Sequence, residues 1–319
     1  MSVEKRSIDK VHFEFRPAKQ VERRMLLEVF QNLMMHNYAI SRYKYTGMGS
    51  KFFIDYILFH RYLGITRMLS VEISEKDAKR VSFNKPYGFI DVEIGDIRDF
   101  IPRLSPDLSH ILWLDYDGII TREIIDTVIL ASSQLSARSI LLVTVDVEPP
   151  GLPGEGRRKY GPASWRRYFM EEAEDYLPRS TRVTDFAKER LSDINGSIVD
   201  SAIRRGLRGR DALFIPMFNF QYADGHAMLS VGGMIGTDSD RVQLETLDRE
   251  RLFYLRRSIT CDPYRITVPI ITRRERLYLD REMPCKDNWC PRDFEMERAD
   301  ILMYREIYKY YPAYTEMLL

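Results

Sequence analysis

The sequence has few cysteines, no long hydrophobic run and almost no net charge. Three cysteines among 319 residues are too few for a disulfide framework, which favours a reducing, cytoplasmic location. Charged residues interrupt each apolar stretch well before the roughly 20 residues that a membrane-spanning helix needs, so no membrane association is expected. A net charge of +1 neither requires nor excludes a nucleic-acid partner, which only local clusters of charge could indicate.

What the sequence does have is a regular alternation of strand-like and helix-like segments. An amphipathic helix over 18–38 comes first. Strands are then expected at 43–46, 68–72, 88–94, 110–114 and 139–145, and helices at 50–62, 75–83, 99–104 and 122–135. This βαβα order predicts an α/β fold, Rossmann-like, with a mostly parallel sheet and helices on both faces.

The rhythm changes after residue 147, where glycines and prolines predict a long loop. We interpret 148–211 as a lid or insertion. Two apolar strands around Asp224-Gly225 then predict a hairpin. The sequence therefore divides into a helical lead-in at 1–40, a sheet domain at 41–237 and an Arg-rich C-terminal region at 238–319 with a helix over 295–311.

A glycine pair follows the first predicted strand. Gly47 and Gly49 let a ligand approach the backbone, and the start of the next helix, with Ser50 as N-cap and Gly64 as its stop, can attract an anion. A dinucleotide-binding fingerprint needs a third glycine where this chain has Phe52. The pattern therefore argues against NAD or FAD.

Acidic residues close the next three predicted strands. Glu72 ends the second strand, where a carboxylate can accept hydrogen bonds from both hydroxyls of a ribose. Asp96 ends the third strand and can accept a hydrogen bond from an adenine amino group, with Ile97 as an apolar wall. Asp115 and Asp117 end the fourth strand. The carboxyl ends of parallel strands share one edge of the sheet, so these side chains are expected to lie together.

This series resembles the class I S-adenosylmethionine-dependent methyltransferases, in particular divergent members of an O-methyltransferase-like kind. The resemblance covers roughly residues 40–236, including the predicted hairpin, because this family ends its sheet with an antiparallel strand. It therefore implies a terminal antiparallel hairpin strand, and it implies S-adenosylmethionine as the cofactor. It implies that Gly47 and Gly49 cradle the methionine portion, that Glu72 holds the ribose, and that Asp96 with Ile97 holds the adenine.

The resemblance also assigns the neighbouring positions. Thr46 and Ser50 stand where the family has an acidic residue and a further glycine, and they complete the expected cofactor loop. Asp115 would face the methyl-donor end, with Tyr116 and Asp117 shaping the pocket of an unidentified methyl acceptor.

Two other functions stay open. The segment "LDYDG" also suits a haloacid-dehalogenase-like phosphatase, with Asp115 as the nucleophile and Asp117 as the acid and base. Alternatively, the chain is a non-catalytic subunit that uses its Arg-rich loop and C-terminal region to bind a protein or nucleic acid. In that loop Arg157, Arg158 and Lys159 are the expected substrate or lid residues.

Overall fold

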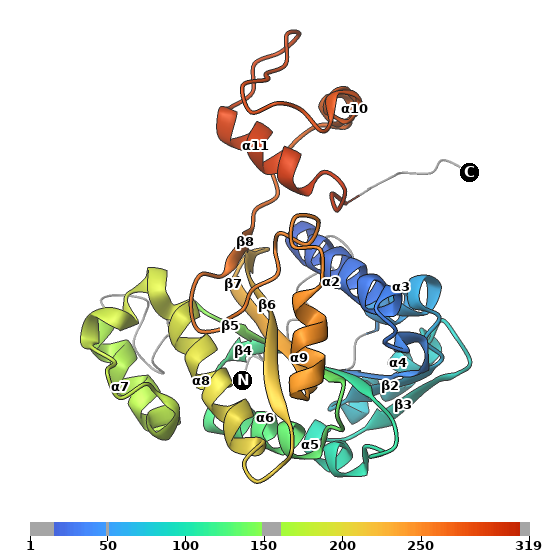
Figure 1. Ribbon diagram of the computed structural model, residues 1–319, viewed down its shortest axis with the longest axis vertical. Coiled ribbons are helices and arrows are strands. Elements are labelled where there is room, and N and C mark those ends of the chain that lie inside the picture. The colour runs from blue at the N-terminus through green and yellow to red at the C-terminus, as the bar shows by residue number, and fades with distance from the viewer. Residues whose placement is uncertain (1–15, 49–50, 149–160, 313–319) are drawn as a thin grey trace.

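The computed structural model describes residues 16–48, 51–148 and 161–312, and its centre is one eight-stranded sheet (Figure 1). The strand order is β3-β2-β1-β4-β5-β7-β6-β8. The strands are β1 (Lys44–Met48), β2 (Arg67–Glu72), β3 (Ile90–Ile94), β4 (His110–Ile119), β5 (Ser139–Asp146), β6 (Leu213–Ala223), β7 (Ala227–Gly236) and β8 (Tyr264–Ile266). β7 pairs antiparallel with β5 and β6, and the other pairs are parallel. The expected mostly parallel α/β fold is confirmed.

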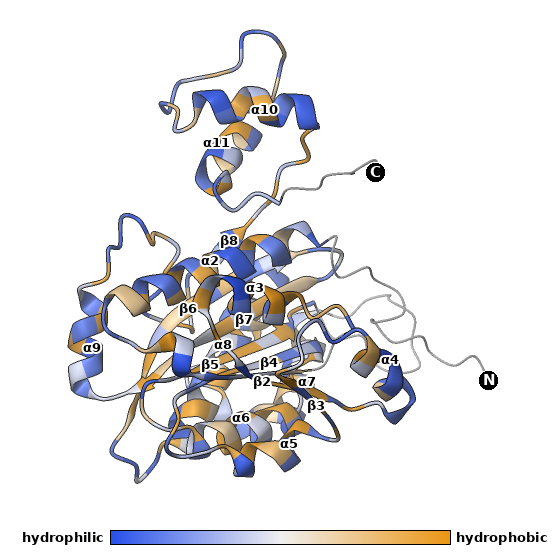
Figure 2. Cartoon of the chain, turned by 90° about the vertical axis from the view of Figure 1, so that its right-hand side faces the viewer, coloured by the Kyte–Doolittle hydropathy of each residue, from blue (hydrophilic) through white to orange (hydrophobic). Residues whose placement is uncertain are grey.

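Helices cover both faces of this sheet, and the last two of the chain's described α-helices lie beyond its edge (Figure 1). The described α-helices are α2 (Pro17–Met35), α3 (Ile54–Leu63), α4 (Ala78–Phe83), α5 (Ile97–Phe100), α6 (Arg122–Gln134), α7 (Pro162–Ala173), α8 (Leu191–Gly206), α9 (Asp238–Glu245), α10 (Arg273–Glu282) and α11 (Arg298–Ile307). Figure 2 shows α2 and α3 above the strands and α5 and α6 below them. None of the described helices is both long and apolar enough to cross a membrane.

The alternation of side chains along the strands produces two separate cores. On β4, Ile111 and Trp113 belong to the core under α2 and α3, whereas Leu112 and Leu114 belong to the core under α6, α7 and α8. Successive side chains of a strand point to opposite faces, so a sheet covered on both sides needs apolar residues at every position of its central strands. This explains the nearly unbroken apolar runs that the sequence shows at β4 and β5.

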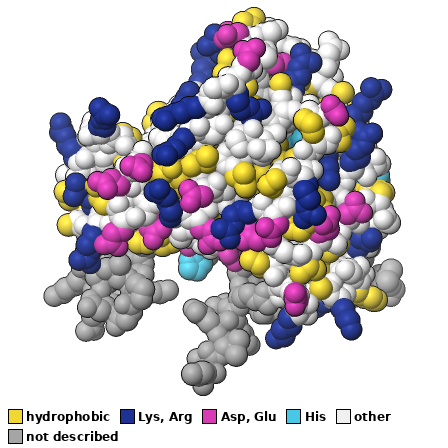
Figure 3. All heavy atoms as spheres, turned by 90° about the horizontal axis from the view of Figure 1, so that it is seen from below, with side chains coloured by type: hydrophobic (Ala, Val, Ile, Leu, Met, Phe, Trp, Pro, Cys, Tyr) yellow, Lys and Arg dark blue, Asp and Glu magenta, His cyan; other side chains and the backbone are white. Residues whose placement is uncertain are grey.

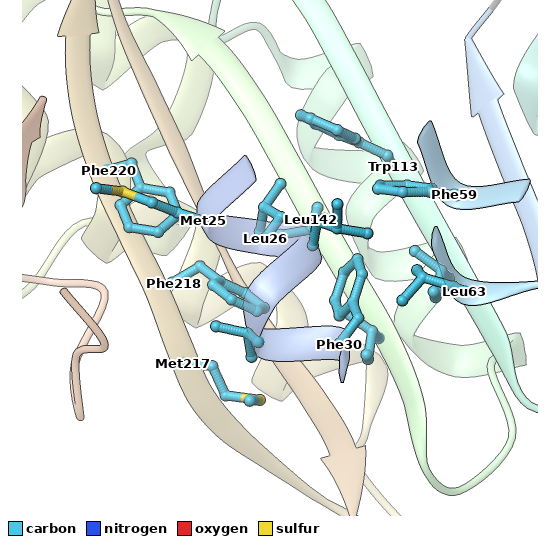
Figure 4. Close-up of a cluster of buried hydrophobic side chains, with 14 of the residues drawn as sticks. Met25, Leu26, Phe30, Phe59, Leu63, Trp113, Leu142, Met217, Phe218 and Phe220 are labelled. Carbon is cyan, nitrogen blue, oxygen red and sulfur yellow. The ribbon is translucent and has the colours of Figure 1, made fainter. Parts of the chain in front are cut away.

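Helix α2 is the main cover of the first face (Figure 4). Its Phe30 is fully buried and meets the rings of Phe59 and Phe218 edge to face, at centroid distances of 5.5 and 6.1 Å. Pro17 occupies the first turn, and the Asp224 carboxylate accepts hydrogen bonds from the backbone N–H groups of Ala18 and Lys19 at 3.0 and 2.9 Å. The side chain that caps α2 therefore comes from the β6–β7 turn.

The C-terminal region contributes one strand to the sheet, and its last two helices lie outside the sheet. β8 is an edge strand next to β6, so the sheet extends beyond the 41–237 range expected from the sequence. α10 and α11 project past the edge of the main body (Figures 1 and 2). Arg24 of α2 holds the chain after α11, because its guanidinium donates to the backbone carbonyls of Tyr310 and Tyr311.

Two element boundaries and the position of one strand in the sheet differ from expectation. α3 begins at Ile54 with Phe53 as its N-cap, in a left-handed conformation (φ 49°), so the predicted start at Ser50 is wrong; the predicted stop at Gly64 is confirmed (φ 71°). The strand that was expected to end at residue 114 continues to Ile119. The antiparallel strand β7 lies inside the sheet, between β5 and β6, and not at its end.

Replacing Phe30 by alanine should lower the free energy of unfolding by about 3–5 kcal/mol, because it empties a fully buried ring site between the sheet and α3. Urea denaturation followed by circular dichroism measures this. Phe83→Ala is the control, since Phe83 is 88% exposed and its loss should change stability by no more than about 0.5 kcal/mol. Equal effects of the two variants would contradict the packing described for α2.

Candidate functional site

The parallel register brings the predicted strand-end residues to one edge of the sheet. Gly47 pairs with Ser70 on β2 and with Trp113 on β4, and Glu72 pairs with Ile94 on β3. The order β3-β2-β1-β4 therefore places the ends of the four strands side by side, with Asp96, Glu72, Gly47 and Asp115 following in that order. Open α/β sheets bind ligands at this edge.

Gly47 lies within β1 and is needed for packing. A β-carbon at this position would lie 2.7 Å from the Tyr45 hydroxyl and 3.0 Å from the Tyr56 hydroxyl. The Tyr56 hydroxyl lies 3.1 Å from the carbonyl oxygens of both Gly47 and Leu69. Thr46 is also inside β1, with 1% of its surface exposed. The packing of two tyrosines thus accounts for glycine here without a ligand.

Five further residues that were predicted for the site have no described position. Gly49 and Ser50 of the expected cofactor loop, and the basic segment 157–159 of the expected lid, lie outside the described residues. Their roles remain predictions.

Glu72 ends β2 as a buried carboxylate. It is 6% exposed, and its Oε1 accepts a hydrogen bond from the backbone N–H of Ser74 at 3.1 Å. The turn after β2 therefore fixes the direction of this side chain. A buried carboxylate at the end of a strand is suited to hydroxyl groups of a ligand that lies across the sheet edge.

Asp96 caps α5. Its Oδ1 accepts hydrogen bonds from the backbone N–H and the Nε of Arg98, at 2.9 and 3.0 Å, and Oδ2 lies 2.5 Å from Arg98 Nη2. These contacts to Arg98 lower the pKa of the Asp96 carboxyl. Ile97, expected as a wall for the adenine, is 6% exposed and belongs to the core under α6. Asp96 thus has a structural role at the position where the adenine contact was predicted.

The three residues at the end of β4 do not form one pocket wall. Asp115 lies on the α2 face of the sheet, whereas Tyr116 packs against the core of the opposite face. Burial raises the pKa of the Tyr116 hydroxyl to about 12, and the nearby carboxylates of Asp96 and Glu123 add to this. Asp117 is exposed. The structure therefore separates Asp115 from Tyr116.

Asp115 belongs to a cluster of buried charges that sequence reasoning missed. Lys19, Glu22 and Arg23 of α2 are 1%, 0% and 5% exposed. Lys19 Nζ lies 3.0 Å from Asp115 Oδ1 and 3.0 Å from Glu22 Oε2, and Arg23 forms an ion pair with Asp55 of α3. The signal was present, because residues spaced i, i+3 and i+4 share a helix face and this face is otherwise apolar.

A second group lies at the end of the neighbouring strand β5. Asp146 Oδ2 is 3.8 Å from Nδ1 of His226, which follows the β6–β7 turn. Burial raises the pKa of the Asp146 carboxyl, and the negative charges of Glu148 and Asp117 raise it further, against the lowering effects of a backbone hydrogen bond and His226. Residues 117, 146 and 226 are far apart in the sequence, so their proximity could not be predicted before the fold was known.

A cavity of about 400 Å³ lies at the same edge, between the start of α2, the β6–β7 turn and β8. Its lining includes Pro17, Ala18, Gln221, Tyr222, Asp224 and Arg265. No group of three or more His, Cys, Asp or Glu side chains suited to a metal ion occurs among the residues that the structure describes.

A family model described as "Putative O-methyltransferase" matches residues 11–319. The chain belongs to this family. This family model gives no support to the phosphatase alternative. No curated protein matches the sequence.

Solved structures of two methyltransferase-related proteins are similar at low identity. Trm1 from Pyrococcus horikoshii, solved in complex with S-adenosyl-L-methionine, shares 15% sequence identity with this chain, and the TM-score is 0.46. The match covers 77% of this chain and 62% of that one. The O-methyltransferase TomG from Streptomyces achromogenes, in complex with SAM, is 14% identical, with a TM-score of 0.36; the match covers 74% of this chain and 93% of that one. The chain thus spans less than two thirds of the length of Trm1.

Replacing Gly47 by alanine should lower the free energy of unfolding by about 1–3 kcal/mol, since the methyl group would displace the hydroxyls of Tyr45 and Tyr56. Thermal and urea unfolding measure the loss. The same substitution in a Tyr45→Phe background should cost less, because the nearest atom is then gone. An equal cost in both backgrounds would show that the Tyr45 hydroxyl is not the obstacle.

Proposed function

We propose that the protein is an S-adenosylmethionine-dependent methyltransferase whose acceptor atom is a hydroxyl oxygen. The observation that carries the proposal is the arrangement of the Glu72, Asp96 and Asp115 carboxylates at the ends of β2, β3 and β4, along one edge of a sheet whose strand order begins 3-2-1-4-5-7-6. Membership of the O-methyltransferase family supports the chemistry. The acceptor is unidentified.

The residues present fit the cofactor at the nucleoside end. The buried Glu72 carboxylate, fixed by the Ser74 backbone N–H, would accept hydrogen bonds from the ribose hydroxyls. Asp96 would reach the adenine amino group with a carboxylate that Arg98 already orients. When bound, S-adenosylmethionine supplies an electrophilic methyl group. The chain's task is then to align the acceptor and to exclude water.

Asp115 is better suited to hold a cation than to take up a proton. Burial alone would raise the pKa of its carboxyl, but the charge and hydrogen bond of Lys19, with the charges of Arg23 and Arg16, lower it below the ordinary value. A carboxylate with a low pKa is a weak base. We therefore assign Asp115 to the positively charged methionine portion of the cofactor.

The acceptor hydroxyl must lose a proton, and Asp146 is the stronger candidate for its base. Its pKa is raised, in contrast to that of Asp115 on the neighbouring strand. Two carboxyl groups whose environments push their pKa values apart are suited to different roles. His226, 3.8 Å from Asp146, can accept or pass on the proton.

A nucleic-acid or protein partner stays a prediction. On the face shown in Figure 3, basic side chains stand among acidic ones. Arg98, Arg122 and Arg204 each form an ion pair with an acidic side chain of the chain itself. Interleaved charges of this kind do not make the continuous basic surface that a phosphate backbone needs.

Calorimetric titration with S-adenosylmethionine, and with its demethylated product, tests the cofactor. Micromolar binding, about −8 kcal/mol, is expected for the wild type. Glu72→Gln should weaken it about tenfold or more, because one carboxylate acceptor of charge-assisted hydrogen bonds is lost. Glu93→Gln on β3 is the matched control, since Glu93 is an exposed residue paired with Arg103. Absence of wild-type binding would refute the proposal.

Transfer of a labelled methyl group to a panel of hydroxyl compounds identifies an acceptor and then tests the base. Asp146→Asn should lower kcat by about 10²-fold or more with a smaller effect on KM, because proton removal is lost while binding surfaces remain. Asp91→Asn, at an exposed position on β3, is the control and should leave kcat unchanged. A wild-type kcat in Asp146→Asn would remove Asp146 from the mechanism.

A further inference from the structure

The most unusual feature of the described chain is a buried ammonium group on its first helix. Lys19 is 1% exposed, and three oxygens surround its Nζ at 3.0 Å: Asp115 Oδ1, Glu22 Oε2 and the Tyr222 hydroxyl. Its Nζ also lies 4.4 Å from the ring centroid of Trp113. Lys19 Nζ donates hydrogen bonds to Asp115 Oδ1 and to the Tyr222 hydroxyl, whereas Glu22 Oε2 is held by charge alone and accepts no hydrogen bond from a described residue. Because Lys19 is buried, we expect it to act through these neighbours.

The ring beneath this ammonium is itself fixed. Trp113 Nε1 donates to Thr144 Oγ1 at 3.0 Å, and the Thr144 hydroxyl lies 2.7 Å from the Ser230 hydroxyl. Residues of β4, β5 and β7 thus form a hydrogen-bonded layer under Lys19. Each of these groups is buried, so the position of Lys19 is set by the sheet and not by solvent.

The charges of the cluster balance only if Glu22 carries a proton. Lys19 and Arg23 are positive, and Asp115 and Asp55 are negative and paired with them. Glu22 remains as a fifth group. Burial raises its pKa, and the opposing effect of Lys19 is smaller. Burial alone would lower the pKa of Lys19, but the acidic groups around its ammonium, Asp115 first among them, together raise it. Lys19 therefore stays charged, and Asp115 is the neighbour that contributes most to this.

We propose that Lys19 is a positioning residue of the cofactor site, which fixes the Asp115 carboxylate so that its second oxygen can bind the ammonium group of the methionine portion. The identity of that cation rests on the proposed function. Asp115 is 31% exposed, and among the described residues only Lys19 forms a hydrogen bond with it, through Oδ1. Oδ2 of this partly exposed carboxylate accepts no hydrogen bond from another described residue, which leaves it available to a ligand.

This role explains why charges are buried here at all. A buried ion pair is on average no more stable than a well-packed apolar substitute, so stability alone does not account for Lys19 or for Asp115. A carboxylate that must stay ionised beside a cofactor needs a fixed cation on its inner side. The first helix, α2, supplies that cation and so becomes a wall of the site.

The test compares Glu22→Gln with the double variant Lys19→Met/Glu22→Gln. Both lack the buried acid, so their difference isolates the ammonium without leaving Glu22 unpaired. Carbon-13 NMR titration of the Asp115 carboxyl, assigned through Asp115→Asn, is the first readout. Removing Lys19 should raise the pKa of Asp115 by about one unit or more, because burial then acts without the cation.

Affinity for S-adenosylmethionine at several pH values is the second readout. The double variant should bind about tenfold or more weakly at pH 7 than Glu22→Gln, and the deficit should grow as the pH falls, since a raised pKa leaves more of Asp115 protonated there. Lys19→Gln in the same Glu22→Gln background keeps a hydrogen-bond donor but removes the charge. It should also raise the pKa of Asp115 and weaken cofactor binding. This variant replaces Lys19→Met if the latter does not fold cooperatively.

The outcomes are distinct. An unchanged Asp115 titration would overturn the proposal, and so would a shifted titration with unchanged cofactor affinity at every pH. A shifted titration together with pH-dependent weakening supports it. If the wild type binds no S-adenosylmethionine, the proposed function fails, and the titration alone then decides whether Lys19 fixes Asp115.

Discussion

The packing of α2 against the sheet is the contact on which the rest of the molecule depends. The helix supplies Phe30 to the core of the first face, Lys19 to the end of β4, and Arg24 to the chain after α11. Its first turn is capped from the β6–β7 turn by Asp224. One helix thus contacts the sheet edge, the β6–β7 hairpin and the C-terminal region. From the sequence it was expected to be a separate N-terminal segment.

This helix combines two kinds of burial that normally compete. Apolar side chains on its inner face gain from leaving water, whereas Lys19, Glu22 and Arg23 on the same face lose hydration. Direct pairing of Lys19 with Asp115 and of Arg23 with Asp55 offsets that loss. Charges placed in a core at such a cost are typical of sites where a ligand requires a defined electrostatic environment.

The sequence predicted the fold well because its signals are local. Apolar runs, glycines at helix C-termini and a turn at Asp224-Gly225 identify β1 to β7 and helices between them, and the ends of the strands identify the edge where Glu72 and Asp115 lie.

The sequence could not predict β8, a three-residue strand whose pairing with β6 depends on the tertiary fold. It could not reveal how Asp96 is engaged by Arg98, nor the meeting of Asp146 with His226, since such contacts follow from side-chain directions and from distant segments. Gly47 was expected to serve a ligand, which stays a prediction; nothing in the sequence indicated that two tyrosine hydroxyls lie within 3.0 Å of where its β-carbon would be, so that packing also favours glycine there.

The long reach of α2 has a consequence for how the chain is made. Its partners on β6, at Asp224 and at Tyr310 follow it in the sequence by most of the length of the chain, so during synthesis on the ribosome its apolar and charged inner face emerges long before they do. Contacts between such distant segments form late and slow the folding of a domain. The nascent helix must therefore remain uncovered, or be shielded by a chaperone, until the last strands have been translated. Assembly of the sheet edge that carries Glu72 and Asp115 then becomes one of the final events in the maturation of the protein.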